Sequence, residues 1–385
     1  MADFSTTGTL SITCPIGMAT PLKEELASMG YRPARVRKTG VDLKGSLNDA
    51  VKLNFWLRTA HRVHWLVDER RSPANPDQLY QWIRKLPWET LIPADGYFSV
   101  TSRIDHPTIR NTQFANLKVK DAVVDRMRRT TGRRPDSGPD LNRTVLFLYW
   151  DRERARIFLD TSGESLSRRG YRTARGEAPM QESLASAILH LSEWTPGTHL
   201  INPMCGSGTL VIEAAMKAMN RPPASLRHDF GFMHISGYDE SVYHGIRDRA
   251  RQQTVREPQG QLIATDRSGE AIKAARRNAR TAGVDQLIEF RVCEYNETPV
   301  PDGEGVVIFN PPYGERLDDD SGLEPIYRGI GDFMKQFCKG KTGYVFTGNF
   351  DLAKRIGLRT SRRIPLFNST IECRLLEYEL YGGSG

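Results

Sequence analysis

Apolar residues recur at two different spacings along the first 160 positions, and together they predict a small α+β region. Leu47, Val51 and Phe55 follow one another at intervals of four, which places them on one face of a helix over 47–57. Short runs rich in β-branched and aromatic residues predict strands instead. These strands are expected at 9–14, 35–38, 62–67, 97–103, 145–150 and 155–159, with further helices at 21–29, 78–86 and 114–129.

From about residue 165 the pattern changes, because apolar strands now alternate with amphipathic helices. Strands are predicted at 199–201, 261–265, 288–293 and 305–309, and helices at 182–193, 210–219 and 269–282. Such alternation indicates a mostly parallel sheet with helices on both faces. The last segment is expected to hold two strands, 344–347 and 371–380, joined by a helix and a loop. Residues 221–259 are too many for one crossover and form an insertion without a predicted role.

Length and composition narrow the class of protein. A chain of 385 residues predicts two or three domains, and a hydrophobic fraction of 39% is enough for globular cores. No run approaches the roughly 18 apolar residues that span a bilayer, and the polar start lacks a signal-peptide pattern. The five cysteines are scattered and form no C-x-x-C pair, which excludes an evident disulfide framework or zinc site. We therefore expect a cytoplasmic protein without a metal.

The positive charge is concentrated in the first part of the chain. Residues 1–165 hold 26 Lys and Arg against 19 Asp and Glu, whereas residues 166–385 hold 28 against 27. A basic half beside a neutral half indicates a module that binds a polyanion, although a well-solvated surface has the same composition.

A glycine loop, 202–209 (NPMCGSGT), follows the strand at 199–201 and opens the next helix. Gly206 and Gly208 allow a sharp turn and close approach of a ligand, and the helix start presents free N–H groups. The loop has no lysine for a phosphate-binding motif, and Val211 stands where a dinucleotide motif has its third glycine. The loop therefore suits a cofactor with an amino-acid end and a nucleoside end.

Acidic residues follow the next two strands. Asp266 comes directly after 261–265, where a carboxylate can accept hydrogen bonds from ribose hydroxyls or, alternatively, cap the following helix. Glu294 and Tyr295 follow 288–293, where they could contact an adenine amino group and stack on its ring, or form a surface turn.

The tetrad Asn310-Pro311-Pro312-Tyr313 follows the strand at 305–309. Two prolines cannot continue a central strand, so they form a rigid turn at the carboxyl edge of the sheet, where ligands bind. The Asn310 side-chain oxygen and the Pro311 carbonyl can accept the N–H groups of an sp2 amino group, which makes its nitrogen nucleophilic toward a methylsulfonium. Tyr313 can stack on the base. The tetrad predicts methylation of an exocyclic amino group on a planar base.

Two cysteines are rival nucleophiles. Thr13-Cys14-Pro15 superficially resembles the cysteine motif with which pyrimidine C5 methyltransferases attack a base covalently. Because Cys14 ends the first strand of the basic region, far in sequence from the glycine loop, a structural role is expected. Cys205 lies in that loop, where we expect it to pack.

Together these motifs resemble those of class I S-adenosylmethionine-dependent methyltransferases, and more narrowly the THUMP-domain RNA guanine-N2 methyltransferase family in its RlmL-like, 23S rRNA-modifying branch. The likeness rests on 12–17 (ITCPIG), 169–172 (RGYR), 177–180 (EAPM), 202–209 and 310–317 (NPPYGERL). Asn202 stands where the family has Asp, as does Glu294. Full-length relatives in one branch carry a second methyltransferase domain, for which this chain ends too early.

The resemblance implies a ferredoxin-like domain (1–64), a THUMP RNA-binding domain (65–164) and a Rossmann-like α/β methyltransferase domain (165–381). It also implies S-adenosylmethionine as the cofactor and RNA as the partner, with rRNA as the expected kind of RNA, and a monomer is assumed. The implied catalytic residues are Asn310, Pro311, Pro312 and Tyr313. The implied cofactor-binding residues are Pro179, Met180, Asn202, Pro203, Met204, Cys205, Gly206, Gly208, Thr209, Asp266, Glu294, Tyr295 and Asn310. The candidate RNA-binding residues, which could instead be a solvated helix end, are Arg126, Arg128, Arg129, Arg133 and Arg134.

Three other functions are compatible with parts of the sequence. A tRNA guanine-N2 methyltransferase would share every motif. A DNA adenine-N6 methyltransferase could use the same tetrad, but it should carry a base-reading domain in place of the basic N-terminal region. A non-catalytic RNA-binding or assembly factor would not need the intact loop, Asp266 or Asn310.

Overall fold

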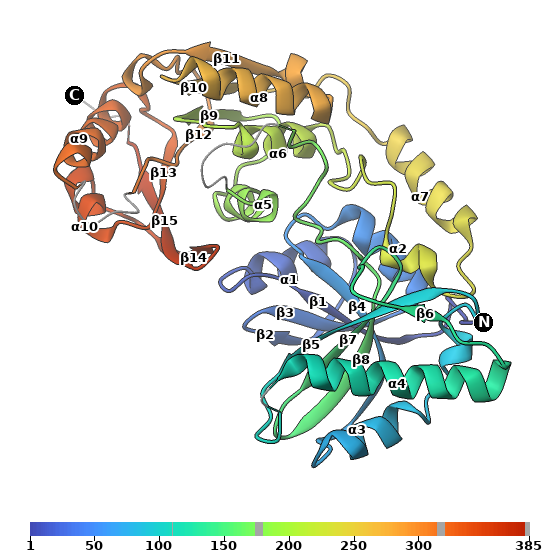
Figure 1. Ribbon diagram of the computed structural model, residues 1–385. Coiled ribbons are helices and arrows are strands. Elements are labelled where there is room, and N and C mark those ends of the chain that lie inside the picture. Colours follow the sequence, from blue (N-terminus) through green and yellow to red (C-terminus); the bar gives the residue numbers. More distant parts are fainter. Residues whose placement is uncertain (110, 174–179, 314–319, 382–385) are drawn as a thin grey trace. The chain divides into compact units, whose positions relative to one another are not determined.

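The computed structural model describes residues 1–109, 111–173, 180–313 and 320–381, with the side chains of 320 and 321 left out. The chain forms two compact units (Figure 1). The first unit comprises residues 1–14, 23–166 and 227–249, and the second comprises 15–22, 167–226 and 250 onward. The domain boundaries expected at 64/65 and 164/165 stay a prediction, and the division shows in addition that part of the insertion belongs to the first unit.

The first unit is built on one eight-stranded sheet with the order β2-β3-β1-β4-β8-β7-β5-β6. Strand β4 joins the two halves, because it pairs antiparallel with β1 on one side and with β8 on the other. The strands are β1 (Gly8–Thr13), β2 (Pro33–Arg37), β3 (Gly40–Gly45), β4 (Arg62–Arg71), β5 (Tyr97–Ile104), β6 (Asp136–Ser137), β7 (Thr144–Trp150) and β8 (Arg154–Asp160). The helices of this part of the chain are α1 (Ala19–Ser28), α2 (Leu47–Trp56), α3 (Pro76–Ile83) and α4 (Thr112–Thr131).

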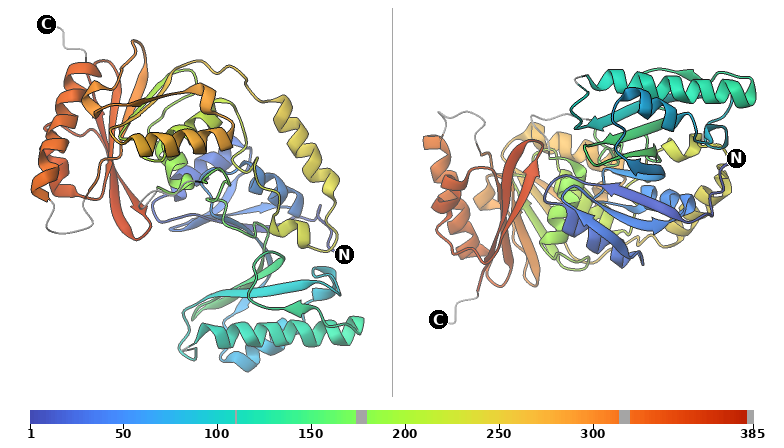
Figure 2. Two further views of the ribbon diagram at one scale, coloured as in Figure 1. Left: turned by 45° about the horizontal axis from the view of Figure 1, so that its top comes forward. Right: turned by 90° about the horizontal axis from the view of Figure 1, so that it is seen from below.

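Alternation along the strands decides which face of this sheet is covered. Leu146, Leu148 and Trp150 in β7 are fully buried on one face. The indole N–H of Trp82 in α3 donates to the Asp68 carboxylate of β4 (2.7 Å). Asp68 lies opposite Ile157 of β8, and Ile157 lies opposite Leu148 of β7, so these three side chains share one face of the sheet. Helix α3 therefore packs on the Leu148 face, and Figure 2 shows α3 and α4 together on one side of these strands.

Several expected elements are confirmed, and three strands of the first unit differ from expectation, one of them the two-residue β6, which was not predicted. The helix predicted at 47–57 is α2, whose N-cap Ser46 forms a capping box with Asp49. Strand β3 was missing from the prediction because glycines at 40 and 45 bound it like a turn, although its Val41 and Leu43 are fully buried. Strand β4 extends to Arg71, four residues beyond the expected end at 67, because β8 pairs with its polar half.

The insertion has a structural role that its sequence did not indicate. Arg227 donates to the main-chain carbonyls of Ser162, Ser165 and Glu164 in the segment after β8. Phe232 N–H donates to Thr161 O (2.9 Å), and helix α7 (Glu240–Gln252) follows. The insertion thus leaves the α/β part of the chain and completes the core of the first unit.

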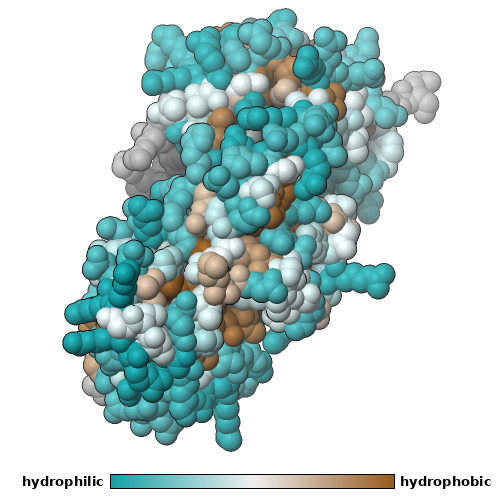
Figure 3. Space-filling view, turned by 90° about the vertical axis from the view of Figure 1, so that its right-hand side faces the viewer, coloured by the Kyte–Doolittle hydropathy of each residue, from teal (hydrophilic) through white to brown (hydrophobic). Residues whose placement is uncertain are grey.

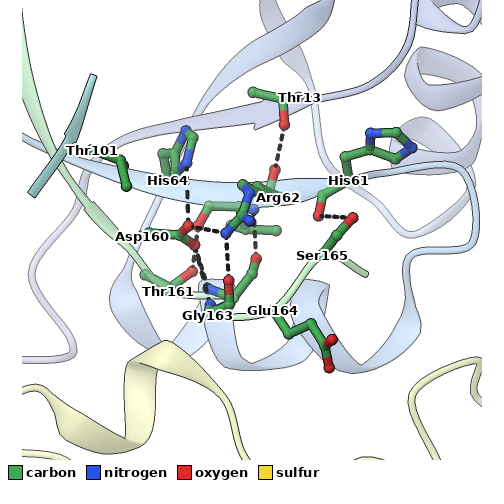
Figure 4. A network of polar contacts seen from close by, with 12 residues as sticks. Thr13, His61, Arg62, His64, Thr101, Asp160, Thr161, Gly163, Glu164 and Ser165 are labelled. Carbon is green, nitrogen blue, oxygen red and sulfur yellow. Dashed lines mark hydrogen bonds and ion pairs between the residues drawn. The ribbon is translucent and has the colours of Figure 1, made fainter. Parts of the chain in front are cut away.

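A buried carboxylate fixes the end of β8 (Figure 4). Asp160 is 3% exposed and forms an ion pair with Arg62, which also donates to Gly163 O. The main-chain N–H of Ser162 donates to the second carboxylate oxygen (2.9 Å), and His64 Nε2 lies 3.7 Å from the first. These contacts tie β4 to the segment that leaves β8.

The second unit is a seven-stranded sheet with the order β11-β10-β9-β12-β13-β15-β14, in which the first five strands are parallel. Strand β15 is antiparallel to both of its neighbours. The strands are β9 (His199–Pro203), β10 (Leu262–Asp266), β11 (Ile288–Val292), β12 (Gly305–Phe309), β13 (Thr342–Thr347), β14 (Arg363–Asn368) and β15 (Ile371–Glu379). The helices are α5 (Glu182–Leu191), α6 (Thr209–Ala218), α8 (Gly269–Ala282), α9 (Asp320–Phe337) and α10 (Phe350–Ala353).

Strand β14 was expected to be a loop. Pro365 argues against a strand, because proline cannot donate to a ladder. The structure places β14 at the edge of the sheet, where only β15 pairs with it and the missing N–H is tolerated.

Among the described residues, no helix is long and apolar enough to cross a membrane. On the face shown in Figure 3, most residues are hydrophilic and the hydrophobic ones lie in separate small areas.

Candidate active site

The candidate site lies where the strand order of the second sheet reverses. Strand β9 lies between β10 and β12, and chain connections lead away from it in opposite directions. In open α/β sheets ligands bind at this switch point, beyond the carboxyl ends of the strands. The glycine loop follows β9 and the Asn310 tetrad follows β12, so the two strongest motifs meet at one edge of the sheet.

The glycine loop takes backbone conformations that its residues make possible. Met204, Gly206 and Gly208 all have positive φ angles, of 56°, 54° and 79°. A Cβ on Gly208 would lie 2.9 Å from Cβ of Ala275 in α8, whereas nothing lies within 4 Å of a Cβ on Gly206. Gly208 is therefore needed for helix packing, and Gly206 faces open space.

Asp266 holds the loop from the neighbouring strand. One carboxylate oxygen accepts the N–H of Gly206 (2.9 Å), and the other accepts the N–H of Ser268 (2.9 Å). The N-cap of α8 is Ser268, whose hydroxyl accepts the N–H of Ala271, so the helix-cap alternative for Asp266 does not apply. The carboxylate remains half-buried and can accept further hydrogen bonds.

Asn202 bridges β9 and β12. Its side-chain N–H donates to Ile308 O (2.8 Å), at the point where the regular pairing, which ends at Ile201 and Val307, stops. The residue is 2% exposed, and its Oδ1 accepts no hydrogen bond from any described residue. An ionised aspartate could not donate to Ile308 O, so this hydrogen bond explains why an asparagine is suited to position 202.

Asn310 carries a second buried amide oxygen without a described hydrogen-bond donor. The turn after it is anchored, because Tyr327 in α9 donates its hydroxyl to Pro312 O (3.3 Å) and also contacts Thr347 Oγ1 (2.7 Å). A buried polar atom without a partner is costly. The arrangement therefore favours a ligand N–H at Asn310 Oδ1.

Tyr313 is oriented by the β14–β15 hairpin. Asn368 Nδ2 donates to its hydroxyl (2.7 Å), and a Cβ on Gly348 would lie 3.2 Å from its ring. The ring is half-buried, so one part of it remains available. Asn368 and Gly348 lie far along the chain from the tetrad, and no sequence motif marked them.

Arg172 connects the RGYR motif to the cofactor loop. Its Nη2 donates to Met180 O (2.7 Å) and to the hydroxyl of Thr209 (3.1 Å), the first residue of α6. Met180 is buried, while Pro179 lies outside the described residues. Asn278 in α8 supports the same loop through Ser207 O (3.2 Å). Neither Arg172 nor Asn278 was predicted as a site residue, although the motif around Arg172 was noted.

A buried polar cluster is centred on Glu213 of α6. Glu213, 1% exposed, accepts hydrogen bonds from Ser186 (2.6 Å) and from Tyr171 (3.1 Å), and Arg169 forms an ion pair with it. Burial raises the pKa of Tyr171 well above its usual value, with Glu213 contributing, so the tyrosine stays neutral and donates. The cluster fixes residues 169–172 against the helix that begins at the glycine loop.

Glu294 and Tyr295 are placed differently from each other. Glu294 is exposed and begins a short 3-10 helix in which it forms a capping box with Glu297. Tyr295 packs edge-on against Phe309, and its hydroxyl lies against Gly329 of α9. The tyrosine thus contacts the core below the tetrad, and its role in stacking on a cofactor remains a prediction.

The cysteines are poor nucleophiles in this fold. Burial raises the pKa of Cys14 to about 12, despite an opposing effect of Arg37. Burial and Asp266 also raise the pKa of the Cys205 thiol. Both side chains therefore stay protonated near neutral pH, which fits the packing roles expected for them.

The five candidate RNA-binding arginines have unequal surroundings. Arg126 is paired with Glu89, and Arg133 lies 3.8 Å from Asp95. Arg128 and Arg134 are exposed but line a hollow that also contains Asp77, Asp121 and Asp125. Arg129 is exposed. Much of the positive charge at this helix end is thus balanced by nearby carboxylates.

Metal chemistry has no evident ligands in the described part of the chain. Among these residues no group of three or more His, Cys, Asp or Glu side chains could hold a metal ion.

Family models match three successive parts of this chain. An RMKL-like methyltransferase domain covers residues 169–377, more than half of the sequence. The chain belongs to this methyltransferase family. An RlmL ferredoxin-like domain matches 9–64 and a THUMP domain matches 73–158, so the expected resemblance and fold class are confirmed.

Two relatives and one solved structure resemble this methyltransferase family member along nearly its whole length. The Syntrophotalea carbinolica ribosomal RNA large subunit methyltransferase K/L is 39% identical over 96% of the chain, which spans 53% of that protein. The Synechocystis sp. protein slr0064, named as a candidate RNA methyltransferase, is 33% identical, covering 98% of each chain. The structure of SMU.472, described as a candidate methyltransferase complexed with SAH, is 29% identical, with a TM-score of 0.90 over 98% of this chain and 99% of that one.

Proposed function

We propose that this chain transfers a methyl group from S-adenosylmethionine to the exocyclic N2 of a guanine in structured RNA, with 23S ribosomal RNA as the substrate. The observation that carries this proposal is the buried Asn310 Oδ1, an acceptor without a described donor at the carboxyl end of β12. The chain would act in the cytoplasm as a monomer.

The cofactor assignment is supported by the glycine loop and by the SAH in SMU.472. SAH, S-adenosylhomocysteine, is the product that remains after methyl transfer from S-adenosylmethionine. Asp266 can accept from ribose hydroxyls and Asn202 Oδ1 from an ammonium group, while Gly206 leaves open space for the ligand. S-adenosylmethionine supplies an electrophilic methyl group on its sulfonium.

The residues of the tetrad activate and place the base. Asn310 Oδ1 and the Pro311 carbonyl accept the two N–H groups of the amino nitrogen, so its lone pair is held out of the ring and points at the methyl carbon. Tyr313, held by Asn368, stacks on the base. As the new N–C bond forms and the S–C bond breaks, the nitrogen releases one proton to solvent. Placement and fixed acceptors are sufficient for such a displacement.

The substrate is inferred from the N-terminal modules and from the relatives. The excess positive charge of residues 1–165 supports a polyanionic substrate, and the THUMP match supports RNA over DNA. The relatives named as ribosomal RNA large subunit methyltransferases support rRNA as the substrate. Guanine N2 is proposed from the resemblance of the motifs to the guanine-N2 methyltransferase family, and a tRNA guanine remains the alternative substrate.

The test is transfer of a tritiated methyl group from S-adenosylmethionine to RNA and to DNA by the full chain. The RNA substrate is 23S rRNA from cells that lack this protein. We expect the wild-type chain to label a guanine in this rRNA and the Asn310→Ala variant to give no label. Asn142→Ala, an exposed asparagine in the loop before β7, is the matched control and should retain activity. Label in DNA only, in tRNA only, or undiminished label with Asn310→Ala would contradict the proposal.

A further inference from the structure

One face of the first sheet points away from α3, and we call it the open face. Leu148 and Ile157 share the face on which α3 packs, so their strand neighbours Tyr149 and Arg156, which pair with each other, lie on the opposite side. The open face is defined by six residues on β5, β7 and β8: Thr101, Arg103, Phe147, Tyr149, Arg156 and Phe158.

Two aromatic rings are presented on this face. Phe147 and Tyr149 are half-buried, unlike Leu146, Leu148 and Trp150 between and beside them, which are fully buried. They stand two positions apart on one strand, roughly 7 Å. The buried His64 ring lies parallel to Phe147 at 4.8 Å, and Phe158 packs at 6.1 Å. The rings are therefore held rigidly and keep part of their surface accessible.

Positive charge gathers beside these rings. Three guanidinium groups, of Arg37, Arg154 and Arg156, share two carboxylates, those of Asp42 and Glu69. The Arg156 guanidinium also lies 4.8 Å above the Tyr149 ring. Burial, and then the neighbouring Arg37, lower the pKa of Arg156, as expected where cations outnumber their counterions.

Arg103 extends this basic region onto β5. It pairs with Tyr149 across the sheet and is exposed. Accessible aromatic rings next to arginines match the chemistry of unpaired nucleotides, whose bases stack on rings while phosphates contact guanidinium groups. Bases inside a duplex are stacked on each other and cannot reach such rings.

We propose that the open face binds an unpaired stretch of the RNA substrate, with bases on Phe147 and Tyr149 and phosphates at Arg103 and Arg156. This inference rests on the proposed function for its ligand, RNA. It places an RNA contact on the sheet, in addition to the region in and after the last turns of α4 where the sequence suggested Arg126, Arg128, Arg129, Arg133 and Arg134.

The test measures binding of fluorescently labelled RNA to the full chain without cofactor. A 12-nucleotide single strand is compared with a blunt duplex of equal length. We expect Tyr149→Ala and Arg103→Glu each to weaken single-strand binding about tenfold, with a smaller effect on the duplex. Lys85→Glu is the matched charge reversal, at an exposed position after α3 and away from the open face. It should change the binding affinity less than about twofold, because it alters only the long-range attraction between the protein and the RNA phosphates. Circular dichroism is used to check that each variant is folded, and because Arg103 is exposed we expect its replacement to be tolerated.

Unchanged single-strand affinity in both variants would overturn the proposal, as would a loss with Arg129→Glu but not with Arg103→Glu. Tighter binding of an unrelated acidic peptide than of RNA, lost with Arg103→Glu, would assign the face to a protein partner instead. The proposed function fails separately. If RNA binding depends on Tyr149 but no methyl group is transferred, the proposed reaction is contradicted and the proposed RNA contact on the open face is supported. If methyl transfer occurs but both variants bind RNA as wild type does, the proposed reaction is supported and the RNA contact on the open face is contradicted.

Discussion

The side-chain amide of Asn202 donates to the main-chain carbonyl of Ile308 across 2.8 Å, joining β9 to β12 where their regular pairing has ended. This single contact turns Asn202 Oδ1 away from Ile308 and fixes its orientation as an acceptor. It also connects the strand that begins the glycine loop to the strand that ends at Asn310. The two motifs of the candidate site are therefore positioned by one side chain.

We expect Asn202→Asp to lower stability and cofactor affinity together. The carboxylate cannot donate to Ile308 O, which would leave that carbonyl facing a negative charge, at a cost of about 1–3 kcal/mol. Urea unfolding and calorimetric titration with SAH measure the two effects. Tighter SAH binding with unchanged stability would show that the carboxylate of the family motif is accommodated and that our account of the asparagine is wrong.

The two glycines of the loop should respond differently to alanine. Gly208→Ala places a Cβ 2.9 Å from Ala275 at a positive φ, so the free energy of unfolding should fall by about 1–3 kcal/mol. Gly206→Ala meets nothing within 4 Å and should cost only about 1 kcal/mol, but it should block SAH binding if the ligand occupies that space. Normal SAH affinity in Gly206→Ala would place the cofactor elsewhere.

Arg172→Lys should weaken cofactor binding about tenfold, without unfolding the protein. Both hydrogen bonds, to Met180 O and to the Thr209 hydroxyl, come from Nη2 at the far end of the guanidinium, and the shorter lysine side chain does not place its ammonium nitrogen there. Titration with SAH is the measurement, and Arg277→Lys, an exposed arginine on α8, is the control. Equal SAH affinities for the two variants would remove Arg172 from the support of the site.

The stability of the first unit should depend on the ionisation of Asp160. Burial raises the pKa of this carboxyl, but the neighbouring His64, then Arg62 and the Ser162 N–H, outweigh burial and bring the pKa below its usual value. Because the folded pKa is lower than the unfolded value of about 3.9, the contribution is present above roughly pH 4 and is lost as pH falls through the folded pKa.

Asp160→Asn should accordingly lower the free energy of unfolding by about 3 kcal/mol at pH 7, since it leaves a cation beside a neutral amide. The difference from wild type should shrink below pH 4. Urea denaturation at pH 7 and pH 3 gives both values, with the exposed Asp136→Asn as control. A constant difference at both pH values would show that the network is not held by this charge.

Local patterns were sufficient for much of the fold. The alternation of strands and helices after residue 165 predicted the parallel sheet, and the positions of the glycine loop and of Asn310 at strand ends placed both motifs at one edge. These inferences succeed because period and turn chemistry depend on neighbours in sequence. They failed for β14, where the edge position that tolerates Pro365 is a property of the whole sheet.

The sequence by itself was sufficient to predict the class of reaction, because that prediction rests on four consecutive residues, Asn310 to Tyr313. Only the tertiary structure decided what supports them: Asn368 from β14 orients Tyr313, Tyr327 from α9 anchors Pro312, and Arg172 connects Met180 to Thr209. These partners come from distant segments, and a single side-chain hydrogen bond leaves no periodic trace in sequence. The same reason hid the role of the insertion, since Arg227 finds its carbonyl partners more than 60 positions away only once the first unit has folded.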